Sequence, residues 1–198
     1  MKLAFEDLKA LGNKPRLHGN GFIQLNLDKN NMTRFHVWPG AQIEAQSVST
    51  QIHDHIFEME STILLGELEH TVYEPVFRDT GKYLLYQAEP RMEEDTELVA
   101  ILGSRCDLEI SQKYNFKKGD TYQFEAFKFH ESLGNGLTAT IMHKTAVHKD
   151  KKPRVACLVT KKPDNDFNRY SKDEELLWAE IKKVLDVIKF VEVPEGYL

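Results

Sequence analysis

The segment that decides the fold is Ser49-Thr50-Gln51-Ile52-His53-Asp54-His55, in which one residue separates two histidines. In a β-strand every second side chain points to the same face, so His53 and His55 are expected to aim their rings at one point. A buried pair of imidazoles needs polar partners, and a shared metal ion satisfies one nitrogen of each ring at once. The segment therefore predicts a strand that carries two ligands of one metal ion.

The chain around this segment is dominated by strand patterns. Short runs of alternating apolar and polar residues follow one another from Phe22 to Thr160, and Gly, Pro, Asp and Asn residues separate them. Ten or so short strands without helices between them favour a closed or sandwiched antiparallel architecture over a parallel α/β sheet. We therefore expect an all-β protein.

Each end of the chain predicts a helix. Leu3 to Leu11 has apolar residues at helical spacing and stops at Gly12. Ser171 and Glu174 form a capping-box pattern ahead of an apolar stripe made of Leu177, Trp178, Ile181, Val184, Leu185 and Ile188. We expect this second helix to pack on the barrel, with docking on a second subunit in a homodimer as the alternative. The predicted organisation is a helical cap at 1–20, a barrel at 21–162, and a C-terminal helix and tail at 163–198.

Composition narrows the class of protein. The 198 residues are 41% hydrophobic and 29% charged, which is typical of one globular domain. The net charge of −5 argues against a nucleic-acid partner, because neutralising phosphates requires a basic face. The sequence shows neither a signal peptide nor a membrane span, so we expect a cytoplasmic protein that acts on a small molecule. Cys106 and Cys157 are predicted to be buried thiols, because two cysteines are too few for a disulfide framework.

The residues that follow the histidine pair fit a known order. They are, in sequence, Glu60, Gly66, the turn Gly119-Asp120 and the lone histidine His130. This order resembles the two motifs of the cupin family. The resemblance implies a double-stranded β-helix, or jelly-roll, barrel in which His53, His55 and His130 bind a divalent metal ion, with Glu60 as a fourth ligand. Glu58 is a competing carboxylate, because a turn or bulge before Thr62 leaves the facing of both glutamates open.

Within the cupins, the chain resembles the thiol dioxygenases of the cysteine dioxygenase type. The resemblance lies in Ile52-His53-Asp54-His55 and in Leu64-Leu65-Gly66-Glu67-Leu68. It implies that the metal is Fe(II), that His130 is the third iron ligand, and that His143 lies next to the site. Three histidines leave coordination positions open for a bidentate thiol and for O₂. Glu60 or His143 is expected to manage protons there as the catalytic residue.

Two other functions remain open at this point. Four protein ligands are typical of cupins that use Mn, Zn or Ni as a Lewis acid, and such a site would serve an isomerase, an epimerase or a decarboxylase. A non-catalytic cupin that binds a ligand or regulates another protein is the third reading.

Three further side chains are candidates for the region around the metal. Arg34 and His36 share a strand face with Trp38. If that face lines the barrel, Arg34 is suited to hold a substrate carboxylate or phosphate, and His36 lies beside it. Otherwise both lie on the surface. His70 is in phase with apolar neighbours, so it faces either the metal site or the core.

Overall fold

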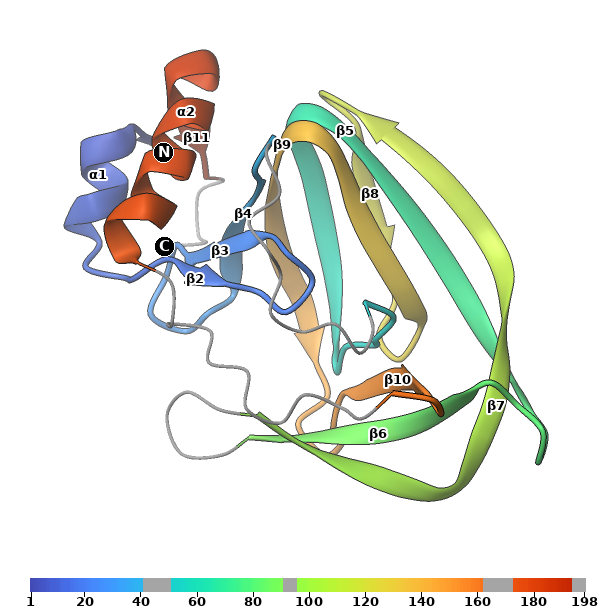
Figure 1. Ribbon diagram of the computed structural model, residues 1–198. Coiled ribbons are helices and arrows are strands. Elements are labelled where there is room, and N and C mark those ends of the chain that lie inside the picture. The colour runs from blue at the N-terminus through green and yellow to red at the C-terminus, as the bar shows by residue number, and fades with distance from the viewer. Residues whose placement is uncertain (41–50, 91–95, 162–172, 194–198) are drawn as a thin grey trace.

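The computed structural model describes residues 1–40, 51–90, 96–161 and 173–193. The described part is mostly antiparallel β-sheet with a helix near each end, which confirms the predicted fold class (Figure 1). The elements are β1 (Lys2–Leu3), α1 (Phe5–Ala10), β2 (Arg16–Leu17), β3 (Ile23–Asn26), β4 (Thr33–Trp38), β5 (Phe57–Phe77), β6 (Tyr83–Pro90), β7 (Thr96–Lys117), β8 (Thr121–Phe124), β9 (Phe129–Val147), β10 (Arg154–Leu158), α2 (Glu174–Ile188) and β11 (Val191–Glu192).

The main sheet closes into a barrel through the histidine segment. Strand β5 pairs with β9 on one side and with β7 on the other, β7 pairs with β6, and β6 pairs with β10. His53 completes the ring, because it forms bridges both to His130 of β9 and to Val155 of β10. The backbone N–H of His53 donates to the carbonyl of His130 at 3.1 Å, and the N–H of His130 donates back at 2.9 Å. The segment was predicted to be a strand; in its described part, residues 51–55, His53 forms isolated bridges, and these bridges close the barrel.

The three longest strands differ from the sequence prediction. Strands β5, β7 and β9 contain 21, 22 and 19 residues, whereas short strands were expected. Gly134-Asn135-Gly136, a run of residues typical of turns, lies inside β9. Bulges explain the difference, because they let one long strand bend while its residue pattern breaks as it does at a turn.

Gly66 marks the bend in β5. Its φ is +75°, and a Cβ placed there would lie 2.5 Å from Thr138 Oγ1. The register of β5 against β9 shifts on both sides of Leu65. Buried side chains consequently change from odd positions such as Met59 and Ile63 to even positions such as Leu68 and His70.

The two helices lie side by side on the outer face of β3 and β4 (Figure 1). The rings of Phe5 in α1 and Trp178 in α2 meet edge to face, with centroids 5.8 Å apart. The apolar stripe of α2 shares a core with the buried residues of β3, β4 and β9. The helix begins after Asp173, whose side chain accepts a hydrogen bond from the N–H of Glu175, and Ser171 lies outside the described residues. Within the described ranges we find no helix with the length and hydrophobicity to cross a membrane.

The chain boundaries of the barrel differ from the expected ones. Strand β2 pairs with β3, so the sheet already begins at Arg16, inside the segment assigned to a helical cap.

A second core lies near β6, β7 and β10 and contains Cys106. Cys157 is buried as well, and both cysteines are free thiols, as predicted.

Asp54 fastens the histidine segment to β10. Its side chain is fully buried and accepts a hydrogen bond from the backbone N–H of Arg154 at 2.5 Å. The guanidinium of Arg154 binds the same carboxylate through Nε at 2.7 Å and Nη2 at 2.6 Å, and it lies over the ring of Phe129. Because the residue between two ligands points away from them, Asp54 is free to act as a structural anchor.

We expect Asp54→Ala to lower the free energy of unfolding by about 3 kcal/mol, because it leaves Arg154 without its buried partner. Asp150→Ala is the matched control, since Asp150 is exposed and meets only Lys151 at 3.9 Å. The control should change stability by less than about 0.5 kcal/mol. Urea unfolding followed by circular dichroism measures both. Equal midpoints for the two variants would contradict the anchoring role.

Candidate metal centre

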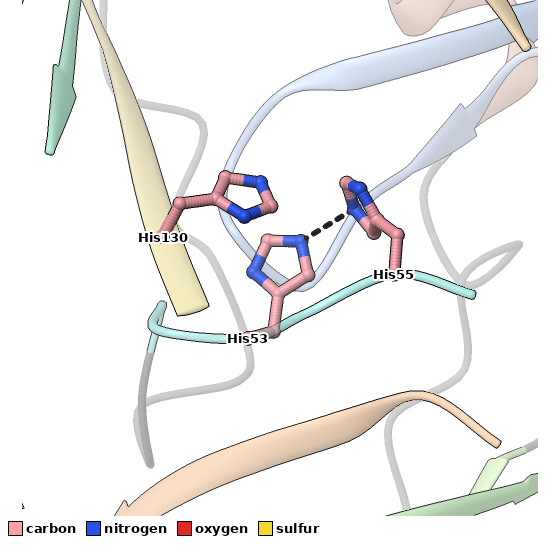
Figure 2. Close-up of side chains that lie close together, drawn as sticks. All are labelled: His53, His55 and His130. Carbon is pink, nitrogen blue, oxygen red and sulfur yellow. Dashed lines mark hydrogen bonds between the residues drawn. The ribbon is translucent and has the colours of Figure 1, made fainter. Parts of the chain in front are cut away.

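The structure brings the three predicted histidines together (Figure 2). His53 and His55 come from the segment before β5, and His130 lies near the start of β9. The Nε2 atoms of His53 and His55 are 3.0 Å apart, and the ligand nitrogens of all three lie within 4.8 Å of one another. The pairing of His53 with His130 across the sheet accounts for this arrangement.

Backbone carbonyls fix the protonation of two of the rings. His53 Nδ1 is 2.8 Å from the carbonyl oxygen of Gln51, and His130 Nδ1 is 3.1 Å from that of Lys128. A carbonyl oxygen only accepts, so each Nδ1 carries the hydrogen and donates it. Each Nε2 is then left with a lone pair that faces the cluster, which is the state of a histidine ligand oriented from behind.

His55 adds an unsatisfied nitrogen to the cluster. Its Nδ1 is buried and has no hydrogen-bond partner within the described ranges, and its ring stacks on Phe57 with centroids 4.4 Å apart. Burial lowers the pKa of His55 and of His130 well below the usual value, and neighbouring histidines lower both further. Neutral imidazoles are the form that binds a cation. The donor set therefore fits one divalent metal ion.

Glu60 does not reach the histidines. It is exposed on the outer face of β5, where its carboxylate accepts a hydrogen bond from Gln123 at 3.3 Å. Its neighbours Met59 and Ser61 point inward and line the cavity that the three histidines also line. The prediction of Glu60 as a metal ligand and catalytic residue is therefore wrong, because inward facing continues at odd positions from His53 onward.

The competing glutamate is excluded by the same alternation. Glu58 is exposed and lies 3.5 Å from His148 Nε2. In the described residues, the cluster consequently contains three imidazoles and no carboxylate.

His143 also lies on the outer face. It stands opposite Glu60 in the register of β5 and β9, and its Nδ1 is 3.1 Å from Thr33 Oγ1. The preceding residue, Met142, faces the cavity instead. The prediction that His143 lies beside the metal is wrong, because the bulges in the β5–β9 ladder set a facing that the sequence pattern leaves open.

Arg34 and His36 line the same cavity as the histidines, together with Trp38. Of the two placements considered for this strand face, the structure has the inward one. Arg34 Nε donates to Asn31 Oδ1 at 2.8 Å. His36 Nε2 and Trp38 Nε1 are buried, and neither has a hydrogen-bond partner in the part of the chain that the structure describes. Burial, followed by the charges of two nearby arginines, lowers the pKa of His36 to about 3, so its ring is neutral.

Two residues of the site were missed in the sequence. His18 and Asn20 follow β2 and line the cavity. Asn20 Nδ2 lies 3.2 Å from His53 Nδ1, and the ring of His18 stacks on Phe22 with centroids 4.3 Å apart. They lie in an irregular loop without periodicity, so no local pattern indicates which way they face.

His70 faces the interior of the barrel. Its ring centroid is 5.1 Å from that of His130, and its Nδ1 is 2.9 Å from Ser132 Oγ. Burial, and then the nearby His53, lower the pKa of His70 to about 4. His70 is thus next to a ligand histidine without belonging to the cluster.

Comparison with known proteins gives no close relative. No family model matches the chain, and no curated protein matches it. Similar solved structures include the CENP-C cupin domain of Drosophila melanogaster, with 7% identity over 66% of this chain and 74% of that chain and a TM-score of 0.36. Two others are hydroquinone 1,2-dioxygenase from Sphingomonas sp. TTNP3 (10% identity, 61% and 63% covered, TM-score 0.34) and oxalate decarboxylase from Lactobacillus farciminis (14% identity, 100% and 45% covered, TM-score 0.37). These TM-scores are low, so the case for a metal centre rests on the residues themselves.

Proposed function

We propose that this protein is an Fe(II)-dependent dioxygenase that binds its iron through His53, His55 and His130 and oxidises a small thiol or a similar chelating substrate. One observation carries the proposal: three imidazoles converge, and none of the described carboxylates joins them. Three protein ligands leave coordination positions for both a bidentate substrate and O₂. When bound, ferrous iron supplies the one-electron chemistry that lets O₂ react with the thiol.

The surrounding residues hold the ligands in place. The carbonyls of Gln51 and Lys128 orient two of the rings through Nδ1, and the buried ion pair of Asp54 with Arg154 fixes the strand between them. Such partners behind the ligands raise metal affinity by restricting ring rotation.

The size of the cavity favours a small substrate. Its volume is about 50 Å³, whereas one water molecule needs roughly 10–15 Å³. Aromatic and apolar side chains such as Phe22 and Met59 form part of the wall and keep bulk water out. A short thiol fits this space better than a sugar does.

Polar groups at the wall favour a carboxylate on that substrate. Arg34 offers a guanidinium, which suits bidentate binding of a carboxylate. Among the described residues, the buried N–H of Trp38 has no acceptor, and the buried Nε2 of His36 has no hydrogen-bond partner either. An anionic group of the substrate would satisfy the buried N–H of Trp38 beside Arg34.

The outward position of Glu60 also bears on the alternative functions. The Lewis-acid reading, with Mn, Zn or Ni in an isomerase, epimerase or decarboxylase, drew its support from a fourth protein ligand. Without Glu60 that support is gone, and the oxygenase is favoured. A non-catalytic role in binding or regulation predicts no turnover with any thiol.

Oxygen uptake tests the proposal directly. The protein is loaded with Fe(II) without air and mixed with cysteine, cysteamine or 3-mercaptopropionate in an oxygen electrode. We expect at least one thiol to be consumed together with an equal amount of O₂, because a dioxygenase transfers both oxygen atoms. His130→Ala should abolish uptake, and His148→Ala, which replaces a histidine outside the cavity, should retain it. Absence of uptake with all three thiols would refute the thiol dioxygenase.

Arg34→Ala tests the carboxylate site. We expect the KM for 3-mercaptopropionate to rise about 10- to 100-fold, because a charge-assisted hydrogen bond contributes roughly 1.5–3 kcal/mol. The KM for cysteamine, which has no carboxylate, should stay within about twofold of the wild type. Arg78→Ala is the control, since Arg78 pairs with Asp107 on the surface. An equal rise for both thiols in Arg34→Ala would show that Arg34 does not read the carboxylate.

A further inference from the structure

A second cavity lies next to the metal cavity, in the region of β5, β7 and β8. Its volume is about 500 Å³, within the range of roughly 300–1,000 Å³ that is typical of small-molecule sites. The lining includes four aromatic rings, which belong to Tyr114, Phe116, Tyr122 and Phe124. The proposed binding of iron, thiol and carboxylate does not involve this cavity.

A buried imidazole with an unsatisfied nitrogen belongs to the lining of this cavity. His70 is only 1% exposed, and no group of the described part of the chain forms a hydrogen bond with its Nε2. Its Nδ1 is already engaged by Ser132, which lines the metal cavity and not the second one. Nε2 is therefore left for the second cavity. An unpaired buried polar atom costs roughly 1–3 kcal/mol, which a suitable ligand group would recover.

The aromatic side chains form a stacked series beside His70. The rings of Phe116 and Tyr122 are parallel with centroids 4.3 Å apart, and Tyr114 stacks on Phe116 at 5.4 Å. The ring of Phe124 meets His70 edge to face at 4.7 Å. Such surroundings favour a flat aromatic ligand over a flexible aliphatic one, because offset and edge-to-face ring contacts add to the burial of apolar area.

The charges at this cavity favour a neutral ligand. Lys128 of the lining forms an ion pair with Glu74 at 3.3 Å, and Glu125 adds a second carboxylate. An anionic ligand would have to compete with Glu74 for Lys128, and both carboxylates would repel it. A hydroxyl group is the simplest neutral partner for His70 Nε2, since it donates or accepts and so matches either tautomer of the imidazole.

We propose that this second cavity binds a small phenol, with the ring against the aromatic side chains and the hydroxyl group hydrogen-bonded to His70 Nε2. The proposal does not depend on the identity of the metal or on thiol oxidation. Tyr122 lines both cavities, so the bound ring lies one side chain away from the metal cavity.

Calorimetric titration with 4-methylphenol and with toluene, which has the same ring and lacks the hydroxyl group, tests the proposal. In the full-length wild-type protein, we expect the phenol to bind about tenfold more tightly than toluene, because one hydrogen bond contributes about 1.4 kcal/mol. The preference should be the same before and after treatment with EDTA, since the site does not include the metal.

The variants locate the site. His70→Phe keeps a ring and removes the nitrogen, so it should bind the two ligands equally. His143→Phe replaces a histidine on the outer face and should keep the tenfold preference. Equal binding of phenol and toluene by the wild type, or an unchanged preference in His70→Phe, would overturn the proposal. The comparison of phenol with toluene in the wild type tests the proposal even if a variant fails to fold. Its result does not depend on the outcome of the oxygen-uptake assay.

Discussion

The structure depends on one pair of backbone hydrogen bonds, those that join His53 to His130. They close the ring of strands, because the segment around His53 is the link between β9 and β10. They also place two ligand side chains opposite each other, and strand alternation then adds His55. The same hydrogen bonds thus close the barrel and bring the histidines together. A fold that failed to close would not assemble the candidate metal site.

The short extended segment from His53 to His55 separates two tasks by the alternation of its side chains. The side chains of His53 and His55 face the cavity, whereas Asp54 between them binds Arg154 on β10. The anchor Asp54 is fully buried in an ion pair, whereas burial lowers the pKa of His55 well below its usual value and keeps that imidazole neutral. The backbone carbonyls of Gln51 and Lys128 orient the rings of His53 and His130, and no acidic side chain of the described residues joins the cluster. The described cluster therefore consists of three imidazoles, and the proposed oxygenase rests on this donor set.

The sequence predicted the fold class and the three histidines, because both follow from spacing within one strand and from a recognisable order of motifs. It placed Glu60 and His143 wrongly, because each position depends on facing across bends and bulges in long strands. His18 and Asn20 escaped notice because they reach the cavity from an irregular loop. For Arg34 and His36 the sequence left two placements open, and only the pairing of β4 with β9 decides between them. Local periodicity was therefore a sound guide within a strand and a poor one beyond a bulge.

The metal content of the protein tests whether His53, His55 and His130 bind one iron ion. The wild-type protein and its variants are loaded with Fe(II) without air, passed through a desalting column and analysed by inductively coupled plasma mass spectrometry. We predict about one iron ion per chain in the wild type, and at least a tenfold loss of bound iron in His53→Ala and His130→Ala. Glu60→Gln should keep its full iron content, because that side chain lies on the outer face of β5. Full iron content in both histidine variants, or loss of iron in Glu60→Gln, would contradict the three-histidine site.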